Sequence, residues 1–312
     1  MIKLINGLVI LIMLSGCAGY QLQLTTPSPD PEKYNTFVPL VSAESTQPMP
    51  TSSPTKTSSP TSLPTMVPTP EETLTPSPGQ YFITLPPGSD LPGDAECAAA
   101  VKSRPENKGL NAVYNSTPGN QSLASDFFGN SDDPRANSEI APRVSGNFTG
   151  TTDEILQWVA CKWGIDEDIV RAQAALESWW HQNAMGDWTS DPNSCPPGHG
   201  LGVDGQPGMC PESWGVLQNR YPYEQSSWPG IADSTAFNVD TAYAIWRTCF
   251  EGYEWWLNDV DHGAEYSAGD AWGCIGRWFT GRWDTQPGND YADRVKDYLN
   301  NRIWETAGFQ EP

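Results

Sequence analysis

The pattern of apolar positions predicts helices throughout the C-terminal half of the chain. Between Thr152, which has the features of a capped start, and Gly164, apolar residues recur at helical spacing: Ile155, Trp158, Val159 and Trp163. Asp166 caps a second predicted helix, which has one apolar face: Ile169, Ala172, Leu176 and Trp179. The pattern therefore predicts two consecutive helices joined by a short turn.

Three more helices are predicted further along. Asn238 opens a long helix whose buried side contains Ala242, Ile245, Trp246, Cys249, Tyr253 and Trp256. Ser267–Asp270 has a capping-box pattern for a shorter helix. Asp290 opens the last helix, with one face formed by Tyr291, Val295, Tyr298 and Arg302. There is little strand signal except near 214–218, so we expect a mostly α (α+β) fold with a small hairpin beside the cleft.

The N-terminal third has too few large apolar residues to build a core of its own. From Thr25 to about Pro87 the sequence is dominated by Thr, Ser and Pro, which predicts a disordered, extended stalk rising about 3 Å per residue. The predicted organisation has four parts: a lipoprotein signal peptide at 1–16, a linker at 17–95, an irregular disulfide-tied extension at 96–151 and a folded domain at 152–312.

The first residues have the order of a secretory signal peptide, with one Lys, a short apolar run and then small residues. Leu14–Cys17 reads Leu-Ser-Gly-Cys, which resembles the lipobox of bacterial lipoproteins, where the Cys is diacylated and becomes the mature N-terminus. The alternative is an ordinary signal peptide followed by a chance Cys. We expect an exported, membrane-anchored bacterial lipoprotein on the extracytoplasmic side, held through two acyl chains on Cys17.

The chain contains seven Cys, an odd number. With Cys17 reserved for lipid, an even set remains, which in an exported protein predicts disulfide bonds. Proximity along the sequence alone favours three pairs: Cys97–Cys161, Cys195–Cys210 and Cys249–Cys274. The alternative is a metal site built on Cys195, His199 and Cys210. Because the sequence has no Cys-x-x-Cys pair and no His-Glu-x-x-His motif, we expect no metal.

Net charge narrows the range of partners. The formal net charge is -21 and the isoelectric point is near 4.3. Such an acidic chain cannot neutralise a phosphate backbone, so we expect no nucleic-acid partner.

Three short motifs occur in order in the C-terminal half. Residues 163–178 pair two predicted helices and end in Glu177-Ser178. Residues 213–218 read Ser-Trp-Gly-Val-Leu-Gln, and residues 237–240 read Phe-Asn-Val-Asp before the long helix. Together they resemble the soluble lytic transglycosylase family of the lysozyme-like superfamily. The family's corresponding features are a catalytic Glu-Ser, a Ser-x-Gly-Leu-Met-Gln cleft motif and an Asn-initiated helix.

The resemblance covers about residues 152–300 and implies a lysozyme-like fold. It implies cleavage of the β-1,4 bond between MurNAc and GlcNAc in peptidoglycan, which leaves a 1,6-anhydro-MurNAc end. Glu177 would be the catalytic acid, and the residues expected to contact substrate are Ser178, Trp214, Gln218, Trp278 and Tyr291. The alternative for the aromatic residues, and above all for Trp278, is a place in the hydrophobic core. We expect a monomer without a cofactor whose partner is the peptidoglycan glycan strand. Residues 277–281, Arg-Trp-Phe-Thr-Gly, depart from the family's Ala-Tyr-Asn-x-Gly motif, which bears on specificity and product.

Elementary chemistry shows how Glu177 could fill the role that the resemblance implies. Protonating a poorly basic glycosidic oxygen near neutral pH needs a carboxylic acid that keeps its proton. Glu177 lies near the C-terminal end of its predicted helix, where the helix dipole disfavours negative charge. Leu176, Trp179 and Trp180 can exclude water, and no Lys or Arg lies within four residues. We expect a raised pKa; the alternative is a solvated helix residue.

A second carboxylate would indicate a two-acid hydrolase. The candidates lie in or beside the long loop that follows Glu177: Asp187, Asp191, Asp204 and Glu212. The resembling family requires none, because the substrate's own N-acetyl group and 6-hydroxyl assist the reaction. The alternatives to a transglycosylase are therefore a lysozyme- or chitinase-like hydrolase on the same fold and a cell-wall-binding lipoprotein without catalysis.

The lipobox predicts that Cys17→Ala releases the protein from membranes or blocks its processing, because the variant lacks the thiol that accepts lipid. Detergent phase partitioning measures this. If the variant still enters the detergent phase, the chain has a different anchor.

Overall fold

The computed structural model describes residues 82–129 and 132–310. The chain divides into two units, Met1–Met66 and Val67–Pro312, and all described residues belong to the second. The predicted signal peptide, Cys17 and the stalk up to residue 81 lie outside the described residues, so these predictions stay predictions. None of the helices in 82–129 and 132–310 has the length and apolarity needed to cross a bilayer.

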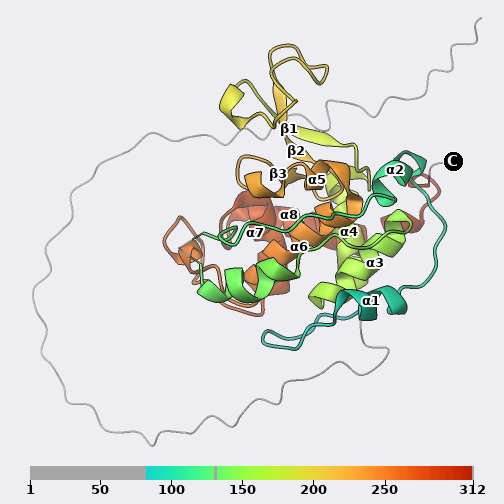
Figure 1. Ribbon diagram of the computed structural model, residues 1–312. Helices are drawn as coiled ribbons and strands as arrows, with labels where there is room; N and C mark the ends of the chain where they lie inside the picture. The colour runs from blue at the N-terminus through green and yellow to red at the C-terminus, as the bar shows by residue number, and fades with distance from the viewer. Residues whose placement is uncertain (1–81, 130–131, 311–312) are drawn as a thin grey trace, which may run out of the picture. The chain divides into compact units, whose positions relative to one another are not determined.

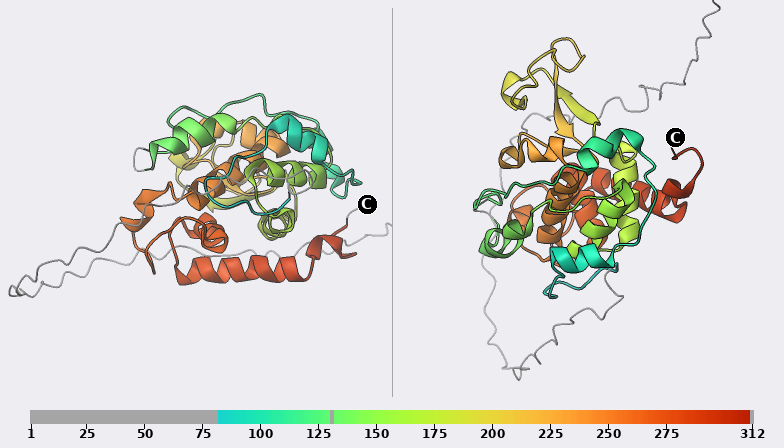
Figure 2. Two further views of the ribbon diagram at one scale, coloured as in Figure 1. Left: turned by 90° about the horizontal axis from the view of Figure 1, so that it is seen from below. Right: turned by 45° about the vertical axis from the view of Figure 1, so that its right-hand side comes forward.

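Five helices of ten or more residues form the body of the described part of the second unit (Figure 1). They are α3 (Thr152–Trp163), α4 (Glu167–Ser178), α6 (Thr235–Phe250), α7 (Ala271–Thr280) and α8 (Gln286–Asn300). Helix α3 packs against α4 and α6, and α8 packs against α4 and α7 (Figure 2). Every residue of α6 is buried, so this helix forms the centre of the domain. The mostly α class expected from the sequence is confirmed.

The boundaries of α3 and α4 follow local capping chemistry. Thr151 caps α3 through a reciprocal pair of bonds with Glu154, one residue earlier than the start read from the sequence. Gly164 ends α3 with a left-handed φ of 56°, a conformation that costs Gly little. Asp166 caps α4 by accepting a hydrogen bond from the Asp168 amide, as predicted.

Helix α6 begins earlier than predicted. Its cap is Ser234, whose hydroxyl accepts the Phe237 amide hydrogen, so Asn238 lies inside the first turn rather than at the start. The helix also ends at Phe250, so Tyr253 and Trp256 do not continue its buried side.

The last two helices also differ from the prediction at their starts. Helix α7 is capped by Asp270, which accepts the Gly273 amide hydrogen, and not by Ser267. Helix α8 starts at Gln286 rather than Asp290 because Pro287 fits the first turn, where no amide donor is needed.

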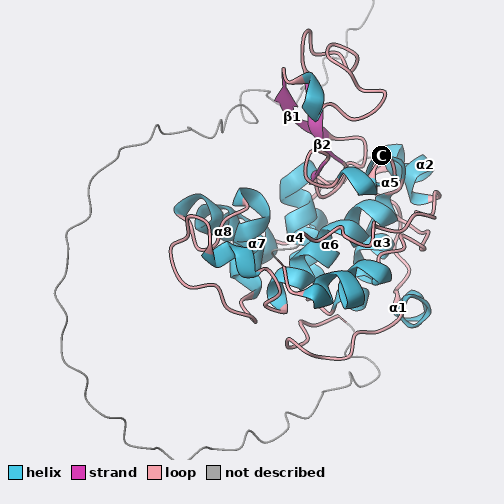
Figure 3. Ribbon diagram, turned by 60° about the vertical axis from the view of Figure 1, so that its left-hand side comes forward, coloured by secondary structure: helices cyan, strands magenta, loops and turns pink. Residues whose placement is uncertain are grey.

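A three-stranded antiparallel sheet interrupts the helices between α4 and α6. Its order is β1 (Met185–Thr189), β2 (Cys210–Trp214) and β3 (Asn219–Arg220). The loop joining β1 to β2 extends away from the helical body (Figures 1 and 3). The strand signal read near 214–218 corresponds to the turn between β2 and β3.

The segment 96–151 was expected to be an irregular extension, but it contains short helices and forms part of the hydrophobic core. It includes the end of α1 (Asp94–Ala100), α2 (Ala112–Asn115) and single turns of 3-10 and π helix, which the sequence reading missed. Its buried apolar side chains join the main core: Cys97, Leu123, Phe128, Ile140 and Val144. A further short helix, α5 (Gly230–Asp233), precedes α6.

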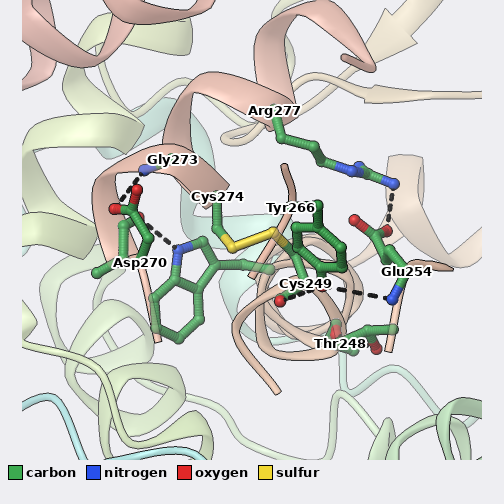
Figure 4. The surroundings of a disulfide bond; sticks show 11 residues. Thr248, Cys249, Glu254, Tyr266, Asp270, Gly273, Cys274 and Arg277 are labelled. Atoms are coloured by element: carbon green, nitrogen blue, oxygen red, sulfur yellow. Dashed lines mark hydrogen bonds and ion pairs between the residues drawn. A yellow bond between two sulfur atoms is a disulfide. The ribbon is translucent and has the colours of Figure 1, made fainter. Parts of the chain in front are cut away.

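Three disulfide bonds tie the described residues together, in the pairing favoured by sequence proximity. They join Cys97 to Cys161, Cys195 to Cys210 and Cys249 to Cys274. The last bond links the end of α6 to α7, next to an ion pair between Arg277 and Glu254 (Figure 4). Helix α7 is thereby held at Cys274 in its first half and at Arg277 in its second half.

We expect no free thiol between residues 97 and 274 in the mature protein, because all six Cys are paired. The Cys97–Cys161 bond closes the longest of the three loops, with a sequence separation of 64. The double variant Cys97→Ala/Cys161→Ala should therefore lose about 4 kcal/mol of unfolding free energy. Thiol labelling of the unfolded, unreduced protein and denaturant unfolding measure the two effects; any label on these Cys would contradict the pairing.

Candidate active site

Glu177 and Ser178 occupy the last turn of α4, where the chain reverses sharply. Trp179 and Trp180 follow with φ of 57° and 65°, left-handed values that are costly for bulky residues. Trp180 is fully buried, and its indole nitrogen donates to the Arg171 carbonyl at 3.0 Å. Packing of this ring offsets the strain and fixes where the helix ends.

Two neutral donors from two other helices meet the Glu177 carboxyl. The Tyr291 hydroxyl on α8 donates to Oε1 in a short hydrogen bond, and the Trp278 indole nitrogen on α7 donates to the same oxygen at 3.1 Å. Tyr291 is 3% exposed, while Trp278 is half-buried. Both residues were expected to contact substrate; the structure brings them to the carboxyl of Glu177.

These surroundings raise the pKa of Glu177 to about 7, mainly because burial desolvates the carboxylate. The negative charge of Asp187 raises the pKa further. The hydrogen bonds from Tyr291 and Trp278 and the charge of Arg294 act in the opposite direction, but they do not outweigh desolvation. Glu177 therefore keeps its proton at pH values below about 7.

A second layer of polar side chains lies behind Tyr291. The Tyr243 hydroxyl on α6 donates to Oε1 of Gln173 at 2.8 Å. Both groups lie close enough to Tyr291 to affect its pKa, which burial raises. Both Gln173 and Tyr243 are buried. The sequence reading missed them; the available signal was a Gln placed one helical turn before Glu177.

The turn after β2 is fastened to α4 and α6. The Ser178 hydroxyl donates to the Val216 carbonyl at 2.9 Å. The buried Asn238 side chain accepts the Leu217 amide hydrogen and donates to the Trp214 carbonyl. Ser178, expected to contact substrate, thus makes a structural bond, and Asn238 holds the loop rather than only starting a helix.

Gln218 lies in this turn, with its side-chain amide close to Gly186 on β1. Its nitrogen donates to the Gly215 carbonyl at 2.8 Å, and its φ of 52° is left-handed. Gly186 has no room for a side chain because a Cβ would collide with the Gln218 amide oxygen. Recognition of an acetamido group by Gln218 stays a prediction.

Trp214 is only 7% exposed. Its ring packs against the rings of His199 and Trp228, with centroids 4.4 and 5.4 Å away. His199 also pairs with Asp204 at 2.9 Å. This cluster attaches the disulfide-bearing loop to the sheet, and a sugar contact by Trp214 stays a prediction.

Of the four acids considered as second carboxylates, Asp187 is the one whose charge acts on Glu177. Its side chain is 54% exposed, accepts a short hydrogen bond from Ser213 and lies 3.7 Å from Arg220. Its φ of 49° is another left-handed outlier near Glu177. The other three have different surroundings: Asp191 caps an exposed turn, Asp204 pairs with His199 and Glu212 pairs with Arg220.

Within residues 82–129 and 132–310, no group of three or more His, Cys, Asp or Glu side chains is placed to hold a metal ion. Comparison of the chain with models of protein families, with curated proteins and with solved structures finds no match.

The raised pKa of Glu177 predicts a pH-dependent effect on stability. The folded pKa near 7 lies above the unfolded value, so the folded state keeps a proton that the unfolded state has lost between about pH 4.5 and 7. Wild-type stability should fall through this window. Glu177→Gln lacks this loss, so it should gain on the order of 2–3 kcal/mol relative to wild type between pH 5 and pH 8. Thermal or denaturant unfolding measures the difference; the same difference at both pH values would contradict the assignment.

Proposed function

We propose that this protein is a peptidoglycan lytic transglycosylase with a lysozyme-like catalytic domain, in which Glu177 acts as general acid and then base. The observation that carries the proposal is the Glu177 carboxyl, which accepts hydrogen bonds from Tyr291 and Trp278 and whose pKa is raised to about 7 by burial. A group with a pKa near 7 matches the requirement of general acid catalysis at neutral pH. The three ordered motifs supply the choice of substrate.

The reaction can be written with one carboxyl group. Glu177 transfers its proton to the glycosidic oxygen as the bond from C1 of MurNAc to that oxygen breaks. The 6-hydroxyl of the same MurNAc then bonds to C1, and its proton returns to Glu177. Atoms balance without water, the product is a 1,6-anhydro-MurNAc end, and the enzyme regains its starting state. The lipid anchor on Cys17 and the stalk would let such an enzyme reach the wall from the extracytoplasmic face of a membrane.

A second candidate, a two-carboxylate hydrolase, is favoured by one observation. The Asp187 side chain is exposed and its charge raises the pKa of Glu177, and Ser213 and Arg220 contact its carboxylate. A carboxylate in this position would take a proton from an attacking water and give a reducing end instead of an anhydro end.

Mass spectrometry of soluble products from purified peptidoglycan distinguishes these functions. The proposal predicts anhydro-muropeptides from the wild type and a loss of turnover on the order of a hundredfold in Glu177→Gln, because the amide has no transferable proton. Asp187→Asn should keep most of the activity, as should the matched change Asp191→Asn in the same loop. Reducing ends that disappear in Asp187→Asn select the hydrolase. Binding without any release selects a cell-wall-binding protein, and full activity in folded Glu177→Gln excludes Glu177 as the acid.

A further inference from the structure

Phe279 on α7 is an exposed aromatic residue close to the Glu177 carboxyl. Its ring stacks on the Tyr291 ring, with an interplanar angle of 1° and centroids 4.9 Å apart. The hydroxyl of the same Tyr291 donates a hydrogen bond to Glu177. Because the Tyr291 ring and this hydrogen bond span the gap, the Phe279 ring lies within about 10 Å of the carboxyl oxygen.

The packing of the domain leaves much of the Phe279 ring uncovered. Phe279 is 44% exposed, whereas Tyr291 beneath it is buried. Phe279 is not among the described residues that form or pack against the hydrophobic core, although its neighbour Trp278 is. A ligand that covers the open side of the ring therefore gains free energy by removing apolar surface from water. Single exposed apolar residues are common on proteins, so the position of this one near Glu177 is the informative fact.

The type of residue at this position is also informative. The segment 277–281 stands where the resembling family has Ala-Tyr-Asn-x-Gly, and Phe279 takes the place of the Asn. An Asn side chain recognises a partner through the hydrogen bonds of its amide, whereas a Phe ring offers a flat apolar face. The difference removes a polar contact and adds a stacking surface at the corresponding point of the chain.

The chemistry of a flat aromatic face suits one class of sugar. A pyranose ring whose substituents are all equatorial has C–H groups on its faces and polar groups around its edge. The face of an aromatic ring carries partial negative charge, which attracts the partly positive hydrogens of these C–H groups. GlcNAc and MurNAc both have this form, and they differ by a lactyl ether on the edge. Stacking on such a face therefore does not distinguish the two sugars.

We propose that Phe279 is a stacking surface for a pyranose ring of gluco configuration bound near Glu177, so that the site binds oligomers of GlcNAc as well as peptidoglycan strands. The part that this contact plays in cleavage rests on the proposed function, whereas binding of the oligomer does not. The alternative is that Phe279 only shields Tyr291 from water, a role that any apolar side chain of similar size fills.

The test is calorimetric titration of the GlcNAc tetramer into the Glu177→Gln protein, which lacks the proposed acid. In this background, Phe279→Ala and Phe279→Leu should each weaken binding by about tenfold, because both lack the flat ring. Phe279→Tyr keeps the ring and should keep the affinity. Trp255→Ala removes another exposed aromatic side chain, in the turn after α6, and should leave the Kd unchanged. Thermal melting checks that each variant folds.

Proton NMR of the bound tetramer gives an independent readout of stacking. An aromatic face shifts the axial protons of a sugar stacked on it upfield. This shift should disappear in Phe279→Leu and persist in Phe279→Tyr, because only the second variant has a ring at this position. A purely structural role of Phe279 would leave no such signature on the sugar.

Full affinity in Phe279→Leu would overturn the proposal, because an apolar cover of Tyr291 would then suffice. Failure of the parent protein to bind the tetramer at millimolar concentration would overturn it as well. If the tetramer binds through Phe279 while the wild type releases nothing from peptidoglycan, the stacking surface stands and the proposed function fails. If anhydro-muropeptides are released while all Phe279 variants bind the tetramer alike, the stacking surface fails and the proposed function stands.

Discussion

One buried carboxylate, Asp240 in the central helix α6, fixes how the domain packs. Asp240 is fully buried and accepts four hydrogen bonds: from the Lys162 ammonium at 2.7 Å, the Trp163 indole at 2.8 Å and the backbone amides of residues 145 and 146 at 2.9 Å each. An unpaired charge in this place would cost several kcal/mol, so α3, α6 and the segment before α3 fit together in one arrangement. Because α4 follows α3 after a short turn, this contact also sets the position of Glu177.

The carboxyl groups of Asp240 and Glu177 have opposite surroundings in this domain. Asp240 forms an ion pair with Lys162, and both of its carboxylate oxygens accept hydrogen bonds. Glu177 receives only neutral donors, both on one oxygen, and its desolvation favours the protonated form. The first arrangement stabilises the fold, and the second raises the pKa of the carboxyl group to about 7.

Several features of the fold and of the candidate site could be predicted from the sequence because they depend on local chemistry. The caps at Asp166 and Gly164, the disulfide pairs and Glu177 at a helix end depend on near neighbours or on simple proximity. The start of α6 was misplaced because Ser234 outcompetes Asn238 as cap, while the Asn238 side chain bonds a distant loop. The hydrogen bond between Tyr243 and Gln173 depends on packing between helices far apart in the sequence, which periodicity cannot show. Trp214, expected in the cleft, packs within an aromatic cluster brought together by the tertiary fold.

The pH dependence of kcat/KM on purified peptidoglycan tests the central claim most directly. If protonated Glu177 delivers the proton that breaks the glycosidic bond, activity must fall as pH rises through a pKa of about 7, with a slope corresponding to one proton. The reverse profile, with activity rising from pH 6 to pH 8, would show that the ionised form of the essential group is required and would contradict the account.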